Sequence, residues 1–438
     1  MRRRPFLGAV GALAACLPAA AGASPALATG RHRVVFWTMQ LSPFHDNYVR
    51  GLIQSFEARQ PRAQVIWVDV PWAEMERKAL ASIAAGTQPD VLNLNPQFSA
   101  RLAELGALAD PRQWLSASEV ASYLPAAWAA NQLGGVPFAL PWYLSTTLTL
   151  ANRSVLRRAG VGVPLNFEQL REAARAVRAS GAGYAWFPAL DGAAPLEAMV
   201  SMNGPLLTPE GCRPAFAGAG GTAVFDYYRE LFAQAWVPPS VLTEGHRSSI
   251  TQFLSGQVAM VATGMQFLGT IKSGNPALYA QIVVAPQTTG PLRVSAGNTA
   301  ASPPNIAAMN LAVPSNSRVP ELAFRFAAHV TNAVNQLELA RRVPLLPSAK
   351  ACFDDVFFTR PMGDALLDQA RAISVRQVFE GAVLVPPMRR YNKLRSSFIR
   401  GLHSAMAGRS TPAQAIDGVV RVWTSLLGCA PEAEGRLT

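Results

Sequence analysis

The sequence predicts an α/β protein whose two lobes enclose a cleft. Its 438 residues exceed what one hydrophobic core usually supports, which favours two lobes. Short apolar segments alternate with helical segments over residues 34–106, a rhythm typical of a mostly parallel sheet covered by helices. No flexible linker divides the chain. The lobes are therefore expected to be joined by a few crossing strands that act as a hinge.

The first lobe is expected to begin with three strand–helix units. Pro43 follows Ser42 directly, a pair that suits the N-cap and first turn of a helix. Gly86 is expected to end the second helix. The expected strands cover residues 34–37, 63–70 and 89–94, and the expected helices follow each strand and end near residues 60, 85 and 106.

The second part of the chain is mostly helical. A strand-like run at residues 148–150 follows the aromatic pair Trp142 and Tyr143, as in a chain that passes between lobes beside a cleft. Asn166 begins a helix with a capping-box pattern. Further helices are expected at 222–235, 248–255, 320–342 (broken near 331), 362–374, 391–407 and 412–427, and short buried strands at 258–262 and 282–285.

Residues 1–28 have the composition of an export signal. Arg2, Arg3 and Arg4 precede an apolar stretch at residues 6–15 that is too short to span a membrane. Arg3 and Arg4 fit a twin-arginine leader, and an ordinary secretory leader is the alternative. Cys16 ends a lipoprotein-like box. The protein is expected in the periplasm or at the outer face of the cytoplasmic membrane, with Cys16 as a candidate lipid anchor.

Charge and cysteine content exclude several classes of partner. The net charge is +12, but the arginines are scattered without a dense run, so no nucleic-acid partner is expected. Cys212, Cys352 and Cys429 lack the CxxC spacing of zinc and thioredoxin-like sites and allow at most one disulfide among them. No cofactor and no metal ion are expected.

Enzyme motifs are also absent from the sequence. It contains no GxSxG, HExxH or P-loop pattern, and its five histidines are dispersed. The glycine-rich run at 218–223 lacks a convincing preceding strand and is expected to be a helix-entry loop rather than a dinucleotide site. No catalytic activity is therefore expected.

Five short motifs follow one another in the chain, at residues 35–37, 84–91, 105–108, 135–160 and 253–264. In this order they resemble the motifs of the extracellular solute-binding proteins of ABC importers, in the sugar-binding family 1 that includes maltose-binding protein. Departures are Ala151 before Asn152, where the family usually has tyrosine, and Met265 after Gly264, where it often has tryptophan.

The resemblance implies a periplasmic-binding-protein-like fold whose lobes close on a solute and then dock on the transmembrane permease subunits of a transporter. It places lobe 1 at 29–145 and 283–332 and lobe 2 at 146–282 and 333–438. The crossings are then expected near 144–148, 280–286 and 330–335. A monomer is expected.

A sugar site needs flat apolar faces for the ring and planar polar groups for paired hydroxyls. Trp142 and Tyr143 are adjacent on a strand, so their side chains cannot share one face. The candidates at strand ends are Trp37, Gln40, Asn93, Asn95, Gln97, Trp142, Tyr143, Ser145 and Trp186, and those that follow cleft motifs in the family are Gln266, Phe267 and Arg389.

The sequence thus predicts a receptor for a carbohydrate or polyol. Within the same fold, the arginine excess leaves open a receptor for glycerol phosphate or another anionic solute. An exported α/β hydrolase and a sensor subunit that signals to a membrane partner are the alternatives from other classes.

Overall fold

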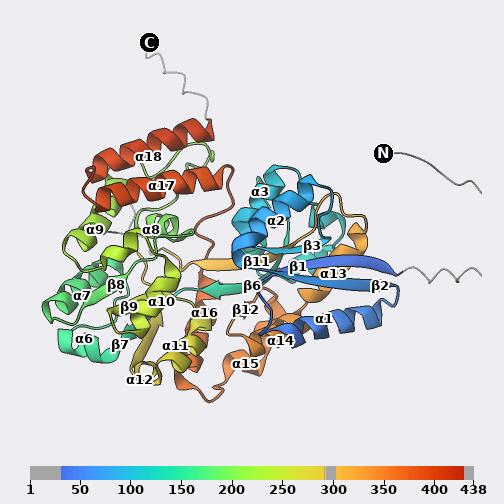
Figure 1. Ribbon diagram of the computed structural model, residues 1–438, viewed down its shortest axis with the longest axis horizontal. Coiled ribbons are helices and arrows are strands. Elements are labelled where there is room, and N and C mark those ends of the chain that lie inside the picture. The colour runs from blue at the N-terminus through green and yellow to red at the C-terminus, as the bar shows by residue number, and fades with distance from the viewer. Residues whose placement is uncertain (1–30, 291, 293–301, 429–438) are drawn as a thin grey trace, which may run out of the picture.

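The computed structural model describes residues 31–290, 292 and 302–428. Figure 1 shows two α/β lobes side by side, joined through the middle of the molecule. The expected leader, Cys16 and Cys429 lie outside the described residues. Within the described part of the chain, no helix is both long and apolar enough to cross a membrane.

The first lobe is built on a six-stranded mixed sheet in the order β12-β6-β11-β3-β1-β2. The early strands β1 (His32–Met39), β2 (Ala63–Val70) and β3 (Val91–Leu94) run parallel, as predicted. The later strands β6 (Leu140–Thr146), β11 (Ile306–Ala312) and β12 (Leu346–Pro347) join antiparallel to their neighbours, which makes the sheet mixed rather than mostly parallel.

Helices cover both faces of this sheet. On one face, Phe56 of α1 (Asp46–Arg59) and Phe326 of α13 (Pro320–Val330) pack edge to face, and Phe326 also packs on Phe36 of β1. On the other face, α2 (Trp72–Ala84) and α3 (Pro96–Glu104) contribute Met75 and Phe98 to a second cluster. The side chains of both clusters are almost fully buried. They hold the strands of this sheet in place, with one end of the sheet directed toward the second lobe.

The second lobe has a four-stranded sheet in the order β10-β7-β9-β8. It consists of β7 (Leu148–Asn152), β8 (Tyr184–Phe187), β9 (Val258–Thr263) and β10 (Ile282–Pro286). Around it lie α6 (Arg153–Ala159), α7 (Phe167–Ala179), α8 (Ala194–Asn203), α9 (Ala219–Ala233), α10 (His246–Leu254), α11 (Leu268–Gly274), α12 (Pro276–Tyr279) and α16 (Ala365–Glu380).

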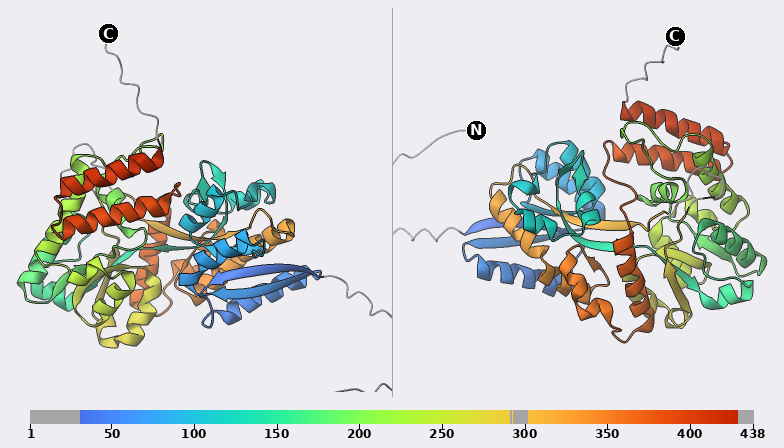
Figure 2. Two further views of the ribbon diagram at one scale, coloured as in Figure 1. Left: turned by 45° about the horizontal axis from the view of Figure 1, so that its top comes forward. Right: turned by 180° about the vertical axis from the view of Figure 1, so that it is seen from behind.

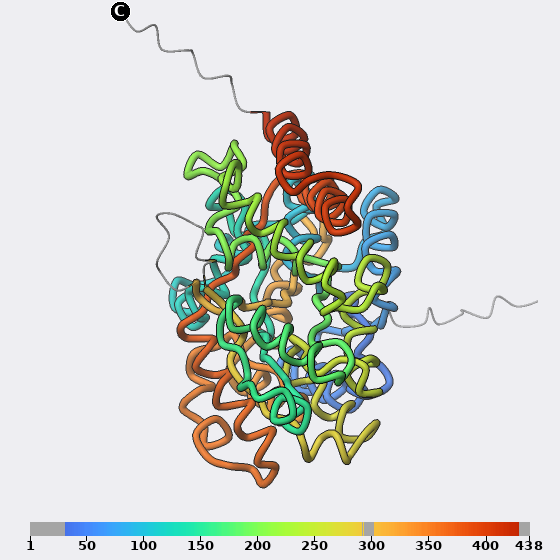
Figure 3. The backbone as a smooth tube through the Cα atoms, turned by 90° about the vertical axis from the view of Figure 1, so that its left-hand side faces the viewer, coloured from blue at the N-terminus to red at the C-terminus, as the bar shows by residue number. Residues whose placement is uncertain are grey.

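The chain ends in a helix pair, α17 (Tyr391–Met406) and α18 (Pro412–Leu427), that packs on α9. Figures 2 and 3 show this pair stacked along one edge of the second lobe. Trp423 of α18 is fully buried and meets Phe216 edge to face at 4.9 Å. The pair therefore belongs to the core of the second lobe.

The first crossing between the lobes lies near its expected position. Only Thr147 separates β6 from β7. The second crossing comes later than expected, because Thr289 N and Leu292 N still donate to Leu165 O and Met202 O of the second lobe. The third crossing differs from the expectation near 330–335. Asn332 caps α14 (Ala333–Arg342), so the predicted helix break is a turn between two helices. Since β12 still pairs with β6, the chain leaves the first sheet only after Pro347.

The described part of the chain contains one disulfide-bonded cysteine and one free cysteine. Cys212 forms a disulfide, and Cys352 is free and buried. Burial raises the pKa of the Cys352 thiol to about 12, so it stays protonated at neutral pH.

Candidate binding cavity at the lobe junction

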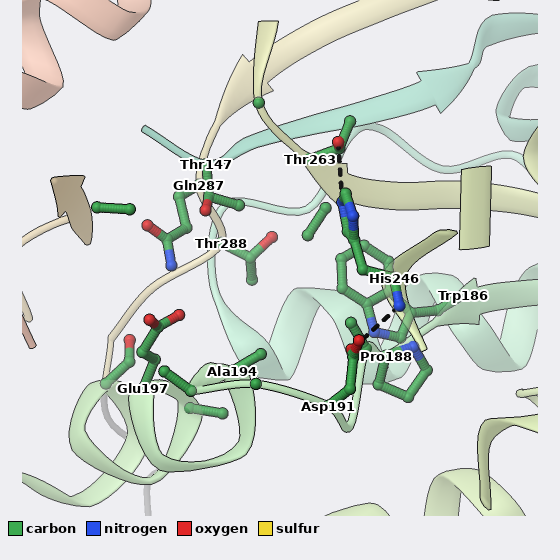
Figure 4. Close-up of a pocket in the computed structure, with 18 of the residues that line it drawn as sticks. Thr147, Trp186, Pro188, Asp191, Ala194, Glu197, His246, Thr263, Gln287 and Thr288 are labelled. Carbon is green, nitrogen blue, oxygen red and sulfur yellow. Dashed lines mark hydrogen bonds between the residues drawn. The ribbon is translucent and has the colours of Figure 1, made fainter. Parts of the chain in front are cut away.

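A cavity of about 510 Å³ lies where the crossings enter the second lobe. Most of its wall comes from the second lobe, through α8, the ends of β8 and β9, and the start of α10. The first lobe contributes Trp72, Ser145, Thr146 and Ala307. Figure 4 shows Glu197 and Gln287 on one side of the cavity and Trp186, Asp191 and His246 on the opposite side.

One wall is a single face of α8. Glu197 and Ser201 stand one turn apart on this face, beside Ala194 and Ala198, whose small side chains leave space next to the carboxylate. Burial raises the pKa of Glu197 to about 7, and the side chain of Asn305 opposes this rise by hydrogen bonding to the carboxylate. The hydroxyl of Ser201 is buried and has no hydrogen-bond partner among the described residues.

The opposite wall is organised around His246, the first residue of α10. Its Nε2 lies 3.0 Å from Thr263 Oγ1, and its backbone N donates to Asp191 Oδ1 over 3.0 Å. Gly245 precedes it because a Cβ there would collide with the Asp191 carboxylate. Burial lowers the pKa of His246, and the nearby Asp191 charge opposes that change. The imidazole is therefore neutral at neutral pH.

The crossings themselves form the third side. Thr288 donates from Oγ1 to Pro164 O over 3.1 Å, and Gln287 accepts at Oε1 from Asn305 N over 2.8 Å. Thr146 is 5% exposed, yet its hydroxyl has no partner among the described residues. Figure 4 shows the Gln287 amide facing Glu197. A solute in this cavity would thus contact the hinge segments directly.

The structure brings three of the predicted residues together in this cavity. These are Ser145, Trp186 and Gln266. Trp186 is 8% exposed and presents part of its ring to the cavity. Gln266 Oε1 is buried without a partner among the described residues, and Gly264 leaves room for this amide because a Cβ there would collide with it.

Two further predicted residues lie just behind the wall. Phe267 packs edge to face on His246 with ring centres 5.0 Å apart. Gln40 accepts at Oε1 from Trp72 N over 3.4 Å, at the rim contributed by the first lobe. Phe267 contacts a side chain and Gln40 a backbone amide of residues that line the cavity, and neither lines it itself.

The prediction that Trp142 faces the cleft is corrected by the structure. Its side chain is fully buried in the first-lobe core, 6.4 Å from the ring of Phe36. Neighbouring strand residues point to opposite faces, and Trp142 occupies the face covered by α1 and α13. Tyr143 is half-buried against the same core and meets Trp142 edge to face at 5.1 Å.

The remaining candidates from the first-lobe sheet have structural roles. Trp37 is a core residue with Lys78 Nζ 4.7 Å from its ring centre. Asn93 is fully buried and donates from Nδ2 to Asn310 O over 3.2 Å. Asn95 caps α3 by accepting from Phe98 N over 2.9 Å.

Gln97 and Arg389 also lie away from the cavity wall. Gln97 is half-buried on α3. Arg389 is exposed in the segment before α17. Neither belongs to the residues that line the cavity.

The sequence reasoning missed Trp72, Asp191, Glu197 and His246. Trp72 is the second residue after β2, so the strand-end criterion used for the other tryptophans would have found it. Glu197 and His246 lie on helices, where a single acid or histidine gives no distinct signal. Among the described residues, no group of three His, Cys, Asp or Glu side chains is placed to hold a metal ion.

Two mixed-sheet lobes with a cavity at their junction define a periplasmic-binding-protein fold. A sequence model of the family described as bacterial extracellular solute-binding protein matches residues 45–337. The match covers more than half of the chain, so the chain belongs to this family of non-enzymatic binding receptors.

Solved structures support the assignment. A putative oligosaccharide periplasmic-binding protein from Synechococcus sp. MITs9220, solved in complex with zinc, is 32% identical with a TM-score of 0.82, over 90% of this chain and 98% of that chain. The GacH receptor of Streptomyces glaucescens GLA.O shares the fold at 21% identity and a TM-score of 0.73, over 90% of this chain and 98% of its own.

Two curated relatives match a smaller part of the chain. An uncharacterized lipoprotein from the oleD 5' region of Streptomyces antibioticus is 26% identical over 302 residues, 64% of this chain and 65% of its own length. The mannitol-binding protein of Pseudomonas aeruginosa is 26% identical over 260 residues, 56% of this chain and 58% of its own length. The chain thus spans less than two thirds of the length of either relative.

Proposed function

We propose that this protein is the extracytoplasmic substrate-binding subunit of an ABC importer and that it binds a carbohydrate or polyol in the cavity at the lobe junction. The observation that carries the proposal is a set of three buried polar atoms without partners among the described residues, all in residues that line this one cavity. They are Thr146 Oγ1, Ser201 Oγ and Gln266 Oε1.

Such atoms are costly to bury unless a ligand satisfies them. A buried polar group without a partner costs about 1–3 kcal/mol, so these positions favour a ligand rich in hydroxyl groups. Trp186 and Trp72 supply the flat apolar surfaces that pack on the C–H face of a sugar ring. One relative is a mannitol-binding protein and one similar structure is a putative oligosaccharide-binding protein, which agrees with this solute class.

The wall chemistry disfavours an anionic solute. Asp191 and Glu197 line the cavity, and no Lys or Arg is found among its described lining residues. Asp191 already caps the N-terminus of α10, where an anion would otherwise bind. A phosphate ester would therefore lose its hydration without gaining a positive partner.

Hinge closure then explains how binding leads to delivery. The second lobe supplies most of the wall, and Trp72 on the first lobe is 46% exposed beside it. Rotation of the lobes about the crossings would bring Trp72 onto the solute and shield it from water. In this proposal, the closed form is the one that docks on the permease.

A thermal-shift screen tests the proposal. Sugars, alditols and their phosphate esters are compared, and a neutral member is expected to raise the melting temperature while its phosphate ester does not. If only phosphate esters stabilise the protein, the receptor for anionic solutes replaces the proposal. If no compound of either kind stabilises it, the carbohydrate assignment is contradicted.

A further inference from the structure

Among the described residues, the cavity wall contains two acidic side chains and no basic side chain to pair with them. The chain as a whole carries a net charge of +12, yet the described lining residues include Asp191 and Glu197 and no Lys or Arg. The one lining histidine, His246, faces a threonine hydroxyl rather than a carboxylate with its Nε2. The wall therefore offers hydrogen-bond acceptors and negative potential to whatever enters.

Glu197 is the more exceptional of the two carboxylates. Among the described ion pairs none involves Glu197, and Asn305 is the one side chain identified as a hydrogen-bond partner of its carboxylate. Tyr391 of α17 is close enough to Glu197 to interact with it electrostatically, and the guanidinium of Arg395 lies 5.6 Å from the centre of the Tyr391 ring.

A second observation at the same wall points independently to a ligand. Ser201 is 3% exposed, stands one turn after Glu197 on the same face of α8, and its hydroxyl has no partner among the described residues. Across the cavity, Gln266 Oε1 is a buried hydrogen-bond acceptor that also has no partner among the described residues. An ammonium group carries three donors and no acceptor, which matches a wall dominated by acceptors.

We propose that the solute carries a protonated amine and that Glu197 is the residue that binds it. This inference rests on the proposed function, because the amine is one substituent of the carbohydrate or polyol. Glu197 would accept a charge-assisted hydrogen bond from the ammonium group, with Ser201 beside it as a second acceptor. Asp191 is the weaker candidate because it already accepts from His246 N, on the opposite side of the cavity.

The aromatic side of the cavity would hold the sugar ring. Figure 4 places Trp186 across the cavity from Glu197, so one ligand can pack its ring on the indole and direct a substituent toward the carboxylate. The binding of a cation within a wall that contains aromatic faces is further favoured by their negative quadrupoles. The cavity is thereby divided into a part beside Trp186 for the ring and a part beside Glu197 for the amine.

Matched ligands test this assignment by calorimetry on the wild-type protein. The probes are sets of mono- or disaccharides whose members differ in one substituent, which is a hydroxyl, an amine, an acetamide or a carboxylate. One such set is glucose, glucosamine, N-acetylglucosamine and glucuronic acid. The amine is expected to bind at least about tenfold tighter than its neutral parent. The acetamide has the nitrogen without the charge and should not share this advantage.

The outcomes separate the inference from the proposed function. A neutral parent or acetamide that binds as tightly as the amine overturns the amine assignment and leaves the carbohydrate receptor intact. If no member of any set binds, the proposed function fails, and the amine assignment fails with it.

A variant then locates the amine. In Glu197→Gln, the ratio of the dissociation constants of the neutral and amine ligands should fall from about ten to about one, whatever the change in overall affinity. Glu172→Gln on α7 removes an exposed carboxylate of the same lobe and should keep the ratio near ten. Circular dichroism verifies that both variants fold, and an unchanged ratio in Glu197→Gln overturns the role of Glu197.

Discussion

The Nε2 of Gln377 donates to the backbone oxygen of Thr147 over 2.9 Å, and Thr147 is the single residue between β6 and β7. The other end of the same amide accepts from Gln287 N over 2.8 Å. Gln377 is 2% exposed. One buried side chain on α16 therefore binds two of the segments that cross between the lobes, and one of them, at Gln287, lines the cavity.

Replacing this amide should weaken the junction. Gln377→Ala leaves Thr147 O and Gln287 N without their partner, and we expect the free energy of unfolding to fall by about 2–4 kcal/mol. Urea denaturation measures the change. Arg376→Ala, an exposed neighbour on the same helix, is the control and should shift the unfolding free energy by less than about 0.5 kcal/mol. Equal effects of the two variants would show that the bridge is unimportant.

Replacing Trp72 tests the part of the cavity wall that the first lobe contributes, without removing a residue that stabilises the fold. We expect Trp72→Ala to weaken binding of a stabilising sugar about tenfold, because its exposed ring lines the cavity without supporting a core. Trp114, 40% exposed and stacked on Phe324 away from the cavity, is the matched control. Calorimetric titration measures the affinity of both variants for the sugar. A loss of affinity in Trp114→Ala as large as in Trp72→Ala would contradict the placement of the site.

Two buried serines should respond in opposite directions. Ser201→Ala removes a hydroxyl without a described partner, so the ligand-free protein should be unchanged or slightly more stable while sugar binding weakens about fivefold. Ser348 is fully buried and donates to Pro141 O over 2.7 Å. Ser348→Ala should therefore destabilise the protein by about 1–2 kcal/mol. Thermal unfolding with and without ligand checks both, and destabilisation of the free protein by Ser201→Ala would argue against its role.

Glu197 predicts a dependence of stability on pH. The folded protein holds the proton up to about pH 7, whereas the unfolded chain releases it near 4.5. The free energy of unfolding should therefore fall as pH rises from about 4.5 to 7, by about 2 kcal/mol from this group because its side chain borders an open cavity. The measurement is the difference between wild type and Glu197→Gln at pH 5 and pH 8. A difference that does not change with pH would show that the carboxylate is not desolvated.

The fold follows from the sequence more fully than the site does. Alternating apolar strands and capped helices identify the elements, because burial sets their period and local hydrogen bonds set their ends. The break at Asn332 could not be recognised as a turn within the first lobe, since an N-cap looks the same at a turn and at a crossing. Only the pairing of β12 with β6 distinguishes the two.

The site depends on directions that a sequence does not contain. Trp142 and Trp186 are both tryptophans near strand ends, yet one is enclosed by α1 and α13 and the other faces the cavity. Which face of a strand is covered is decided by helices far away in the chain. Glu197 and Ser201 can be recognised as cavity residues only when the position of α8 against the crossings is known.

The most direct test of the central claim is a crystal structure of the protein with the sugar, alditol or amino sugar that most raises its melting temperature. The account predicts a solute between Trp186 and Glu197, with hydroxyl or amine groups within hydrogen-bond distance of Ser201 Oγ and Gln266 Oε1. A solute bound elsewhere, or one that leaves these atoms without a partner, would contradict it.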